Sequence, residues 1–299
     1  MILLDGKKIS EQIKEEITQA VNQMKIKGEK VPHLAAILVG NDGASLTYVG
    51  SKVKSCERVG FLSTLIKLPS TTSETELLKK IAELNENDDI DGFIVQLPLP
   101  EQIDTQKVIM AIDPDKDVDG FHPMNFGKMA LDMTTFIPAT PFGILELLER
   151  YGVETKGKHT VVIGRSHIVG RPMSILMGRK GFPGNSTVTL THSHTKNIAQ
   201  ITTQADIIIT ALGVPNYLKA EMVKDDAVVI DVGITRVADE TSPKGYRITG
   251  DVDFENVSKK ASYITPVPGG VGPMTIAMLL KNTLLARERK LLKVRGKNA

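Results

Sequence analysis

The sequence predicts a two-domain α/β fold, and three observations lead to that prediction. The chain has 299 residues, which is more than one hydrophobic core usually serves. Short apolar runs alternate with longer amphipathic segments, the pattern of proteins built on parallel sheets. The alternation occurs twice, on either side of a turn-rich stretch at residues 113–141. We therefore expect two parallel sheets whose functional residues follow the ends of their strands.

The elements before this stretch have distinct signals. Apolar residues recur every four positions from Ile9 to Val21, which predicts a helix over residues 7–27. Ser73 and Glu76 form a helix-capping pattern at the start of a later helix. The other expected elements are helices at 43–59 and 73–84 and strands at 33–39, 62–68 and 92–97.

A helix at residues 142–151 marks the expected domain boundary, and the second series follows it. The terminal helix begins near Met274, and its basic tail at residues 287–297 is expected to be a frayed, solvated end. Strands are expected at 160–163, 187–190, 207–210, 228–232 and 263–265.

Composition indicates a globular protein whose partners are small molecules. Hydrophobic residues make up 41% of the chain, and 37 Lys and Arg residues nearly balance 35 Asp and Glu residues. The formal charge of +2 gives no reason to expect nucleic acid or a membrane as a partner. There is no signal-peptide pattern, and the single cysteine, Cys56, excludes an intramolecular disulfide. We expect a cytoplasmic protein in which Cys56 is a small buried residue.

Residues 160–176 read as a strand, a glycine turn and a helix, which is the layout of a dinucleotide site. Gly164-x-Ser166-x-x-x-Gly170 departs from the usual G-x-G-x-x-G spacing, so a plain strand–helix turn or another phosphate ligand stays open. The next strand ends without the acidic residue typical of NAD sites. Arg165, Ser166 and Ser193 could instead bind a 2′-phosphate, which favours NADP over NAD. No metal is expected, because His192 and His194 lack partners at metal-ligand spacing.

Tyr48 and Lys52 are four residues apart and share one face of a predicted helix. An apolar stripe beside them predicts that Lys52 is partly buried, and burial favours the neutral amine that can act as a base. Lys54 points elsewhere. On spacing alone, such a pair is more often an amphipathic surface pair.

Several motifs in order along the chain resemble the bifunctional methylenetetrahydrofolate dehydrogenase/cyclohydrolase family. The resemblance covers essentially the whole chain. The motifs are Ser45-x-x-Tyr48-Val-x-x-Lys52, Val95-Gln96-Leu97-Pro98-Leu99-Pro100, Lys116-Asp117-Val118-Asp119-Gly120, Gly164-Arg165-Ser166-x-Ile-Val-Gly170, Val229-Ile-Asp231-Val-Gly233-Ile234, Gly250-Asp-Val-Asp253 and Pro266-Val-Pro268-Gly-Gly-Val-Gly-Pro273-Met-Thr275.

The resemblance implies a fold, an assembly and two activities. Residues 1–145 would form the folate-binding catalytic domain, to which a helix at 275–299 returns, and residues 146–274 would form a Rossmann-like NADP domain. The enzyme would be a homodimer. It would oxidise 5,10-methylenetetrahydrofolate with NADP and then hydrolyse the methenyl product to 10-formyltetrahydrofolate.

The resemblance also implies residue roles. Lys52 would be the general base, Tyr48 would pack on the folate, and Gln96 would hydrogen-bond Lys52. Asp119 would bind the donor edge of the pterin, and Ile234 would contact the cofactor through its backbone.

A glycine-rich loop containing Pro268, Gly269 and Gly270 would contact folate and cofactor. Tight turns are the alternative for this loop and for Ile234, and an amide satisfied by the backbone is the alternative for Gln96.

Some features depart from these patterns. Ala139 and Thr191 stand where cysteine is common in the family, and His194 stands at a usually basic position, which weakens the case for NADP. The aspartates at 115, 117 and 119 imitate a calcium loop, but Phe126 occupies the position of its closing acid. A shikimate-type dehydrogenase and a non-catalytic dinucleotide sensor remain as other classes of function.

Overall fold

The computed structural model describes residues 1–242 and 245–297, and these residues form two compact α/β units. The N-unit comprises residues 11–139 and the chain from residue 276 onward, and the C-unit comprises residues 1–10 and 140–275. The sequence predicts residues 1–10 in the first domain. They cluster with the C-unit because strand β1 (Ile2–Leu3) pairs with β11 (Tyr263–Ile264).

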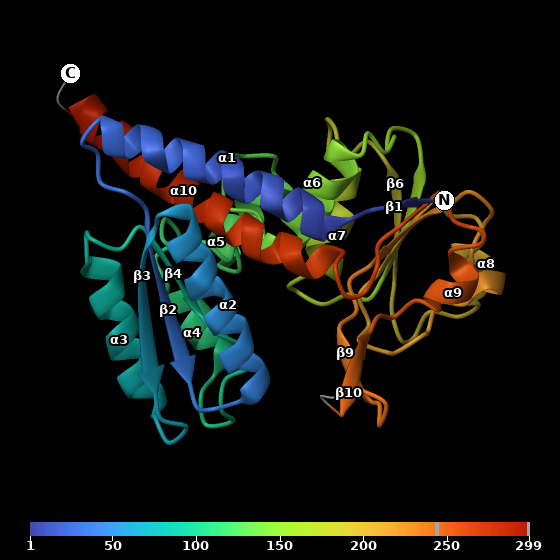
Figure 1. The fold of residues 1–299 in the computed structure, drawn as a ribbon, viewed down its shortest axis with the longest axis horizontal. Coiled ribbons are helices and arrows are strands. Elements are labelled where there is room, and N and C mark those ends of the chain that lie inside the picture. The colour runs from blue at the N-terminus through green and yellow to red at the C-terminus, as the bar shows by residue number, and fades with distance from the viewer. Residues whose placement is uncertain (243–244, 298–299) are drawn as a thin grey trace. The chain divides into compact units, whose positions relative to one another are not determined.

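The N-unit contains a parallel sheet of strand order β3-β2-β4 (Figure 1). The strands are β2 (His33–Val39), β3 (Leu62–Leu68) and β4 (Gly92–Val95). β2 is central and is buried at every residue but its first, which explains its unbroken apolar sequence. The helices of the N-unit are the later part of α1 (Gly6–Ile26), α2 (Gly43–Val59), α3 (Glu74–Glu86), α4 (Thr105–Ala111) and α5 (Pro123–Ala130).

Local signals set the ends of α2 and α3. The Asp42 carboxylate accepts a hydrogen bond from the Ser45 amide at the start of α2, and Gly60, with φ of 81°, ends this helix. The predicted capping pattern of α3 is confirmed, because the side chains of Ser73 and Glu76 each bond the other's backbone amide.

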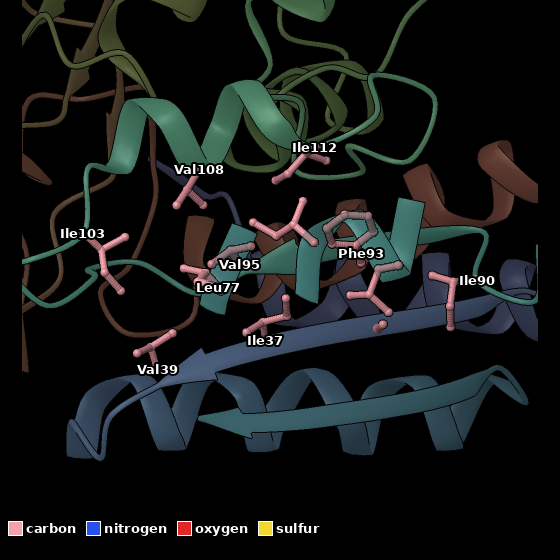
Figure 2. Close-up of a cluster of buried hydrophobic side chains, with 12 residues drawn as sticks. Ile37, Val39, Leu77, Ile90, Phe93, Val95, Ile103, Val108 and Ile112 are labelled. Carbon is pink, nitrogen blue, oxygen red and sulfur yellow. The ribbon is translucent and has the colours of Figure 1, made fainter. Parts of the chain in front are cut away.

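The N-unit core lies between its sheet and the helices α3 and α4. Figure 2 shows Ile37 and Phe93 of the sheet facing Leu77 of α3 and Val108 of α4, all of them fully buried. This packing holds the carboxyl ends of β2 and β4 in a fixed arrangement, which matters for the residues that follow them.

The C-unit is built on a parallel sheet of strand order β1-β11-β8-β7-β5-β6, whose members are all parallel to their neighbours. Its core on one face includes Val161, Ile208 and Val229. The remaining strands are β5 (His159–Ile163), β6 (Thr187–Thr191), β7 (Ile207–Thr210), β8 (Val228–Asp231) and an antiparallel hairpin of β9 (Thr235–Ala238) and β10 (Tyr246–Thr249). The helical segments are α6 (Ala139–Arg150), α7 (Gly170–Gly178), α8 (Ile198–Thr202), η1 (Ala220–Met222) and α9 (Phe254–Val257).

The last helix, α10 (Val271–Lys297), starts in the C-unit and continues into the N-unit. The two-domain α/β class, its Rossmann-like second domain and its returning C-terminal helix are thus confirmed. Asn298 and Ala299, the end of the helix expected at 275–299, lie outside the described residues.

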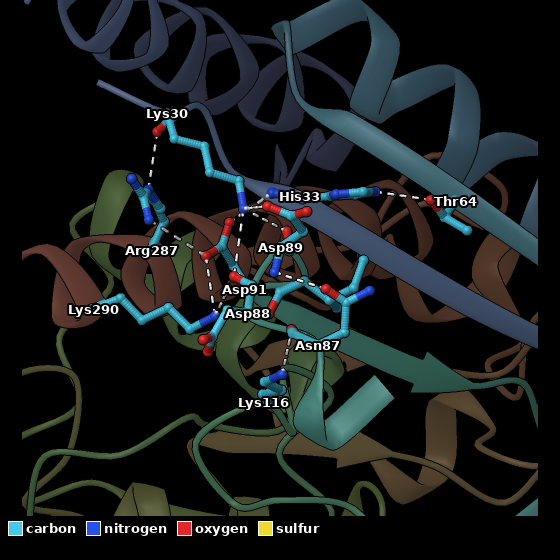
Figure 3. A network of polar contacts seen from close by, with 11 residues as sticks. Lys30, His33, Thr64, Asn87, Asp88, Asp89, Asp91, Lys116, Arg287 and Lys290 are labelled. Carbon is cyan, nitrogen blue, oxygen red and sulfur yellow. Dashed lines mark hydrogen bonds and ion pairs between the residues drawn. The ribbon is translucent and has the colours of Figure 1, made fainter. Parts of the chain in front are cut away.

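The expectation of a frayed, solvated end is wrong for Arg287 and Lys290, because their side chains bond to other segments of the N-unit (Figure 3). Arg287 Nε donates to the Lys30 carbonyl oxygen at 2.9 Å, and Lys290 Nζ donates to that of Ile90 at 2.8 Å. The fully buried Asp91 carboxylate lies 3.8 Å from Arg287 Nη1 and 3.6 Å from Lys290 Nζ.

Over the part of the chain that the structure describes, none of the helices is both long enough and apolar enough to cross a membrane.

Candidate active site and dinucleotide-binding site

Lys52 and Gln96 come from different elements of the N-unit and are hydrogen-bonded. Lys52 lies on α2 with only 8% of its surface exposed, and its Nζ donates to Gln96 Oε1 at 3.1 Å. Gln96 directly follows β4, and its Nε2 donates to the Leu97 carbonyl oxygen at 2.7 Å. Because the amide nitrogen is engaged by backbone, the amide oxygen is turned toward the amine. The side chain is therefore bonded both to backbone and to Lys52.

The face of α2 around Lys52 has the predicted polarity. Lys54 is exposed, and Cys56 is fully buried, where burial raises the pKa of its thiol to about 12. The expected role of Cys56 as a small buried residue is confirmed. Tyr48 is 38% exposed, and desolvation of its hydroxyl raises the pKa of the phenol. An exposed ring beside a buried amine can pack on a flat ligand.

Asp117 and Asp119 have different surroundings, although they are two residues apart. The buried Asp117 carboxylate accepts hydrogen bonds from the His122 amide and from Asn125 Nδ2, both at 2.8 Å, and so holds its own loop. Asp119 is half-buried. Burial raises the pKa of Asp119, the Lys52 charge acts in the opposite direction, and the negative charge of Asp117 adds to the rise. Lys52 and Asp119 therefore lie near enough for their charges to interact.

In the C-unit, the turn after β5 is closed by backbone packing. Gly164 has φ of 113°, and a Cβ there would lie 2.4 Å from the Ala211 carbonyl oxygen. A Cβ at Gly170 would lie 1.9 Å from the Gly164 carbonyl oxygen. The Ser166 hydroxyl accepts hydrogen bonds from the amides of Val169 and Gly170 as α7 begins. Glycine is required at both positions, and residues 165–168 between them are exposed, as residues that bind a phosphate group would be.

Arg165 and the loop after β6 are neighbours in the C-unit. Arg165 and Ser193 are exposed. The His194 amide donates to His192 Nδ1 at 3.2 Å, and the two imidazole rings are 6.0 Å apart in a T-shaped arrangement. Desolvation lowers the pKa of His192, and the positive charge of Arg165 lowers it further. The Arg165 cation thus lies beside the loop that carries the exposed Ser193, an arrangement that suits an anionic group.

The two positions where the family commonly has cysteine are both buried. Ala139 begins α6, and the Thr191 hydroxyl donates to the Val162 carbonyl oxygen at 3.2 Å. Both residues therefore act in packing.

Ile234 and the glycine-rich loop also lie in the C-unit. Ile234 is 46% exposed, and a Cβ at Gly272 would lie 3.4 Å from its Cδ1. Along the loop, Pro268 is exposed, Gly269 has φ of 112° and Gly270 is buried, where its amide donates to the Pro266 carbonyl oxygen at 2.8 Å. The backbone of this loop thus forms a tight turn.

Comparisons with known proteins identify the family. Residues 4–119 match the catalytic domain of tetrahydrofolate dehydrogenase/cyclohydrolase, and residues 138–291 match its NAD(P)-binding domain. The bifunctional protein FolD of Flavobacterium psychrophilum is 88% identical over 290 residues, which are 97% of this chain and 99% of that protein.

Solved structures agree with these matches. The bifunctional FolD enzyme of Campylobacter jejuni has a TM-score of 0.91 at 47% identity, covering 97% of this chain and 99% of that one. The Trypanosoma brucei enzyme, described as complexed with NADP and an inhibitor, has a TM-score of 0.92 at 38% identity, covering 97% and 98%. Shikimate dehydrogenase of Thermus thermophilus is only 13% identical, with a TM-score of 0.50 over 86% of this chain and 99% of that one, and shares the fold alone. The chain therefore belongs to the tetrahydrofolate dehydrogenase/cyclohydrolase family.

Proposed function

We propose that this protein oxidises 5,10-methylenetetrahydrofolate with NADP and then hydrolyses the methenyl product to 10-formyltetrahydrofolate. Membership of the family supports both activities. The observation that carries the hydrolytic half is the buried Lys52 amine, which is oriented by a hydrogen bond from its Nζ to Gln96.

The dehydrogenase step depends on orientation, because hydride transfer needs no base. Bound NADP would supply the nicotinamide ring that accepts the hydride. Gly164 and Gly170 would let the backbone approach its pyrophosphate, and Arg165, Ser166 and Ser193 would bind its 2′-phosphate. The backbone of Ile234 would contact the cofactor, and residues 268–270 would contact folate and cofactor.

The cyclohydrolase step needs a base for the water that attacks the methenyl carbon. Lys52, which Gln96 holds in place, would take the proton from that water. Tyr48 would pack on the pterin, and the half-buried Asp119 would bind its donor edge.

The test of this proposal is turnover by the purified protein. Methylenetetrahydrofolate and NADP should yield NADPH and 10-formyltetrahydrofolate, with the methenyl absorbance rising and falling between them. A non-catalytic dinucleotide sensor would bind NADP and form neither product, and a shikimate-type enzyme would reduce dehydroshikimate instead.

The location and the assembly belong to the same proposal. We expect a cytoplasmic homodimer, as the family resemblance and the single buried cysteine suggest. Light scattering during gel filtration should give twice the 32.6 kDa mass of the chain.

A further inference from the structure

Two buried aspartates of the C-unit have no part in the function proposed above. Asp231 ends β8 and is 3% exposed, and Asp251 follows β10 and is fully buried. Ionised carboxylates are rarely buried without a cation, so their surroundings need an explanation.

The Asp231 carboxylate binds three backbone amides. Its Oδ1 accepts hydrogen bonds from the amides of Gly233 and Asp251, both at 2.9 Å, and its Oδ2 accepts one from Val252 at 3.0 Å. It therefore joins the turn after β8 to the segment after β10.

Asp251 extends this connection to a third segment. Its Oδ2 accepts hydrogen bonds from the amides of Leu212 and Gly213, at 2.6 and 3.1 Å, in the turn after β7. Its Oδ1 is buried and has no hydrogen-bond partner among the described residues. The two carboxylates thus link the turns that follow β7 and β8, two adjacent strands of the sheet.

Backbone packing fixes this arrangement. A Cβ at Gly250 would lie 1.9 Å from Asp231 Oδ2, and a Cβ at Gly233 would lie 2.3 Å from Asp251 Oδ1. A side chain at either position would clash with a carboxylate, so the close approach of backbone and carboxylate requires glycine at both positions.

This arrangement is costly for folding. Burial raises the pKa of Asp231 to about 6, and the neighbouring Asp251 carboxylate adds to the rise, although the three amides oppose it. Five backbone amides, three on Asp231 and two on Asp251, offset part of the cost of burying these neighbouring carboxylates.

We propose that Asp231 and Asp251 are positioning residues for NADP, which fix the turns at residues 211–213 and 232–234 at the carboxyl edge of the sheet. Ligands of open parallel sheets bind at this edge. The second turn carries Ile234, so the inference rests on the proposed contact between the Ile234 backbone and the cofactor.

Asp251→Ala and Asp251→Asn test the inference together. The alanine variant releases the amides of Leu212 and Gly213, and its KM for NADP should rise by about ten-fold or more, the effect of losing a hydrogen bond to a charged group. The asparagine variant keeps an oxygen that both amides can reach, and its KM should stay within about three-fold of the wild-type value. Asp253→Ala is the matched control, because the Asp253 carboxylate contacts Lys219 and Asn256.

Cyclohydrolase activity on methenyltetrahydrofolate supplied directly separates positioning from misfolding, because that step uses no NADP. It should stay near the wild-type rate in Asp251→Ala. An unchanged KM for NADP, or an equal loss of both activities, would overturn the inference. If Asp251→Ala does not fold, Asp251→Ser, whose side chain is shorter by one atom than aspartate's, replaces it.

Arg165→Ala distinguishes a wrong assignment of the NADP site from a wrong assignment of the positioning role. If NADP binding is insensitive to Arg165→Ala, the proposed cofactor site is wrong. If Arg165→Ala weakens NADP binding and Asp251→Ala does not, only the positioning role is wrong.

Discussion

Lys52 is the residue at which the two proposed activities can be separated, because only hydrolysis must remove a proton from water. Lys52→Met keeps much of the side-chain volume and removes the amine bonded to Gln96. Cyclohydrolase activity should fall by about 10²-fold or more, the usual contribution of a positioned base, and dehydrogenase activity should fall much less.

The measurement follows methenyl and formyl products during turnover of methylenetetrahydrofolate with NADP. The methenyl species should accumulate with the mutant, after correction for its uncatalysed hydrolysis. Lys54→Met, on the exposed side of α2, is the matched control. If Lys52→Met lowers both activities by the same factor, Lys52 positions the folate and is not the base.

Arg165 should determine the choice between NADP and NAD. Arg165→Ala removes a cation from an exposed position next to His192, and it should cost NADP binding on the order of 1.5–3 kcal/mol while NAD binding changes little. Calorimetric titration with both cofactors gives the two free energies. Equal losses for NADP and NAD would contradict the assignment of a 2′-phosphate site.

Sequence patterns gave only part of this residue-level detail. Helical spacing predicted that Lys52 is buried and Lys54 exposed, and both are observed. Spacing could not bring Gln96 to Lys52, because 44 residues separate them and the contact depends on the pairing of β4 with β2. The roles of Asp231 and Asp251 were missed for the same reason, since an isolated aspartate carries no sign of burial until its long-range partners are known.

At the scale of the elements, a mutation can test whether Asp91 anchors α10. The buried Asp91 accepts a hydrogen bond from the His33 amide at 2.9 Å and lies near Arg287 and Lys290 (Figure 3). Asp91→Ala leaves the amide and both cations without this partner, so the free energy of unfolding should drop by on the order of 3 kcal/mol.

Urea unfolding followed by circular dichroism measures this drop. Asp89→Ala is the matched control, because the Asp89 carboxylate is 81% exposed and pairs with Lys30 at the surface, where an ion pair contributes at most about 1 kcal/mol. Similar losses for the two variants would show that Asp91 does not anchor α10.

The strength of the local signal decided which elements could be predicted. The strands predicted at 33–39, 62–68 and 207–210 match β2, β3 and β7 at both ends. β2 and β7 are buried parallel strands, which are nearly continuous apolar runs, whereas β3 is an edge strand without a buried residue. The turn-rich stretch at residues 113–141 also contains α5, which was not predicted and which has Pro123 in its first turn.

Two other pieces of structure were not predicted. β1 has only two residues, too few for any periodicity, and its place depends on pairing with β11. The β9–β10 hairpin is largely polar and lacks a buried apolar run. Both depend on partners that lie elsewhere in the fold.

For the whole molecule, the proposed functions divide between the two units. The N-unit contains all the residues proposed for hydrolysis, which are Lys52, Gln96, Tyr48 and Asp119. The residues proposed to bind NADP lie in the C-unit. A change in the stability of the C-unit should therefore affect the dehydrogenase more than the cyclohydrolase. Asp231 gives that stability a defined dependence on pH.

Asp231 should make the protein less stable as the pH rises from 5 to 7. Its pKa is raised in the folded state to about 6, from an ordinary value of 3.8, so folding favours the protonated carboxyl. The resulting stabilisation is complete below pH 3.8 and is lost as the pH rises through 6. A shift of this size corresponds to roughly 3 kcal/mol at most.

Asp231→Asn isolates this contribution, because asparagine does not titrate. The mutation should lower the free energy of unfolding most at pH 5, where Asp231 of the folded wild type is protonated. The difference in this free energy between the two proteins should be smaller at pH 7. The charged side chains that line the same cavity as Asp231 are Lys219, Arg247, Asp253 and Glu255, and the buried Asp251 also acts on it. These groups remain in the variant, so their own effects cancel in the difference between the two proteins.

Urea midpoints measured at half-unit steps of pH give that difference. If the difference is the same from pH 5 to pH 7, Asp231 is not protonated on folding, and its three amide hydrogen bonds outweigh its burial.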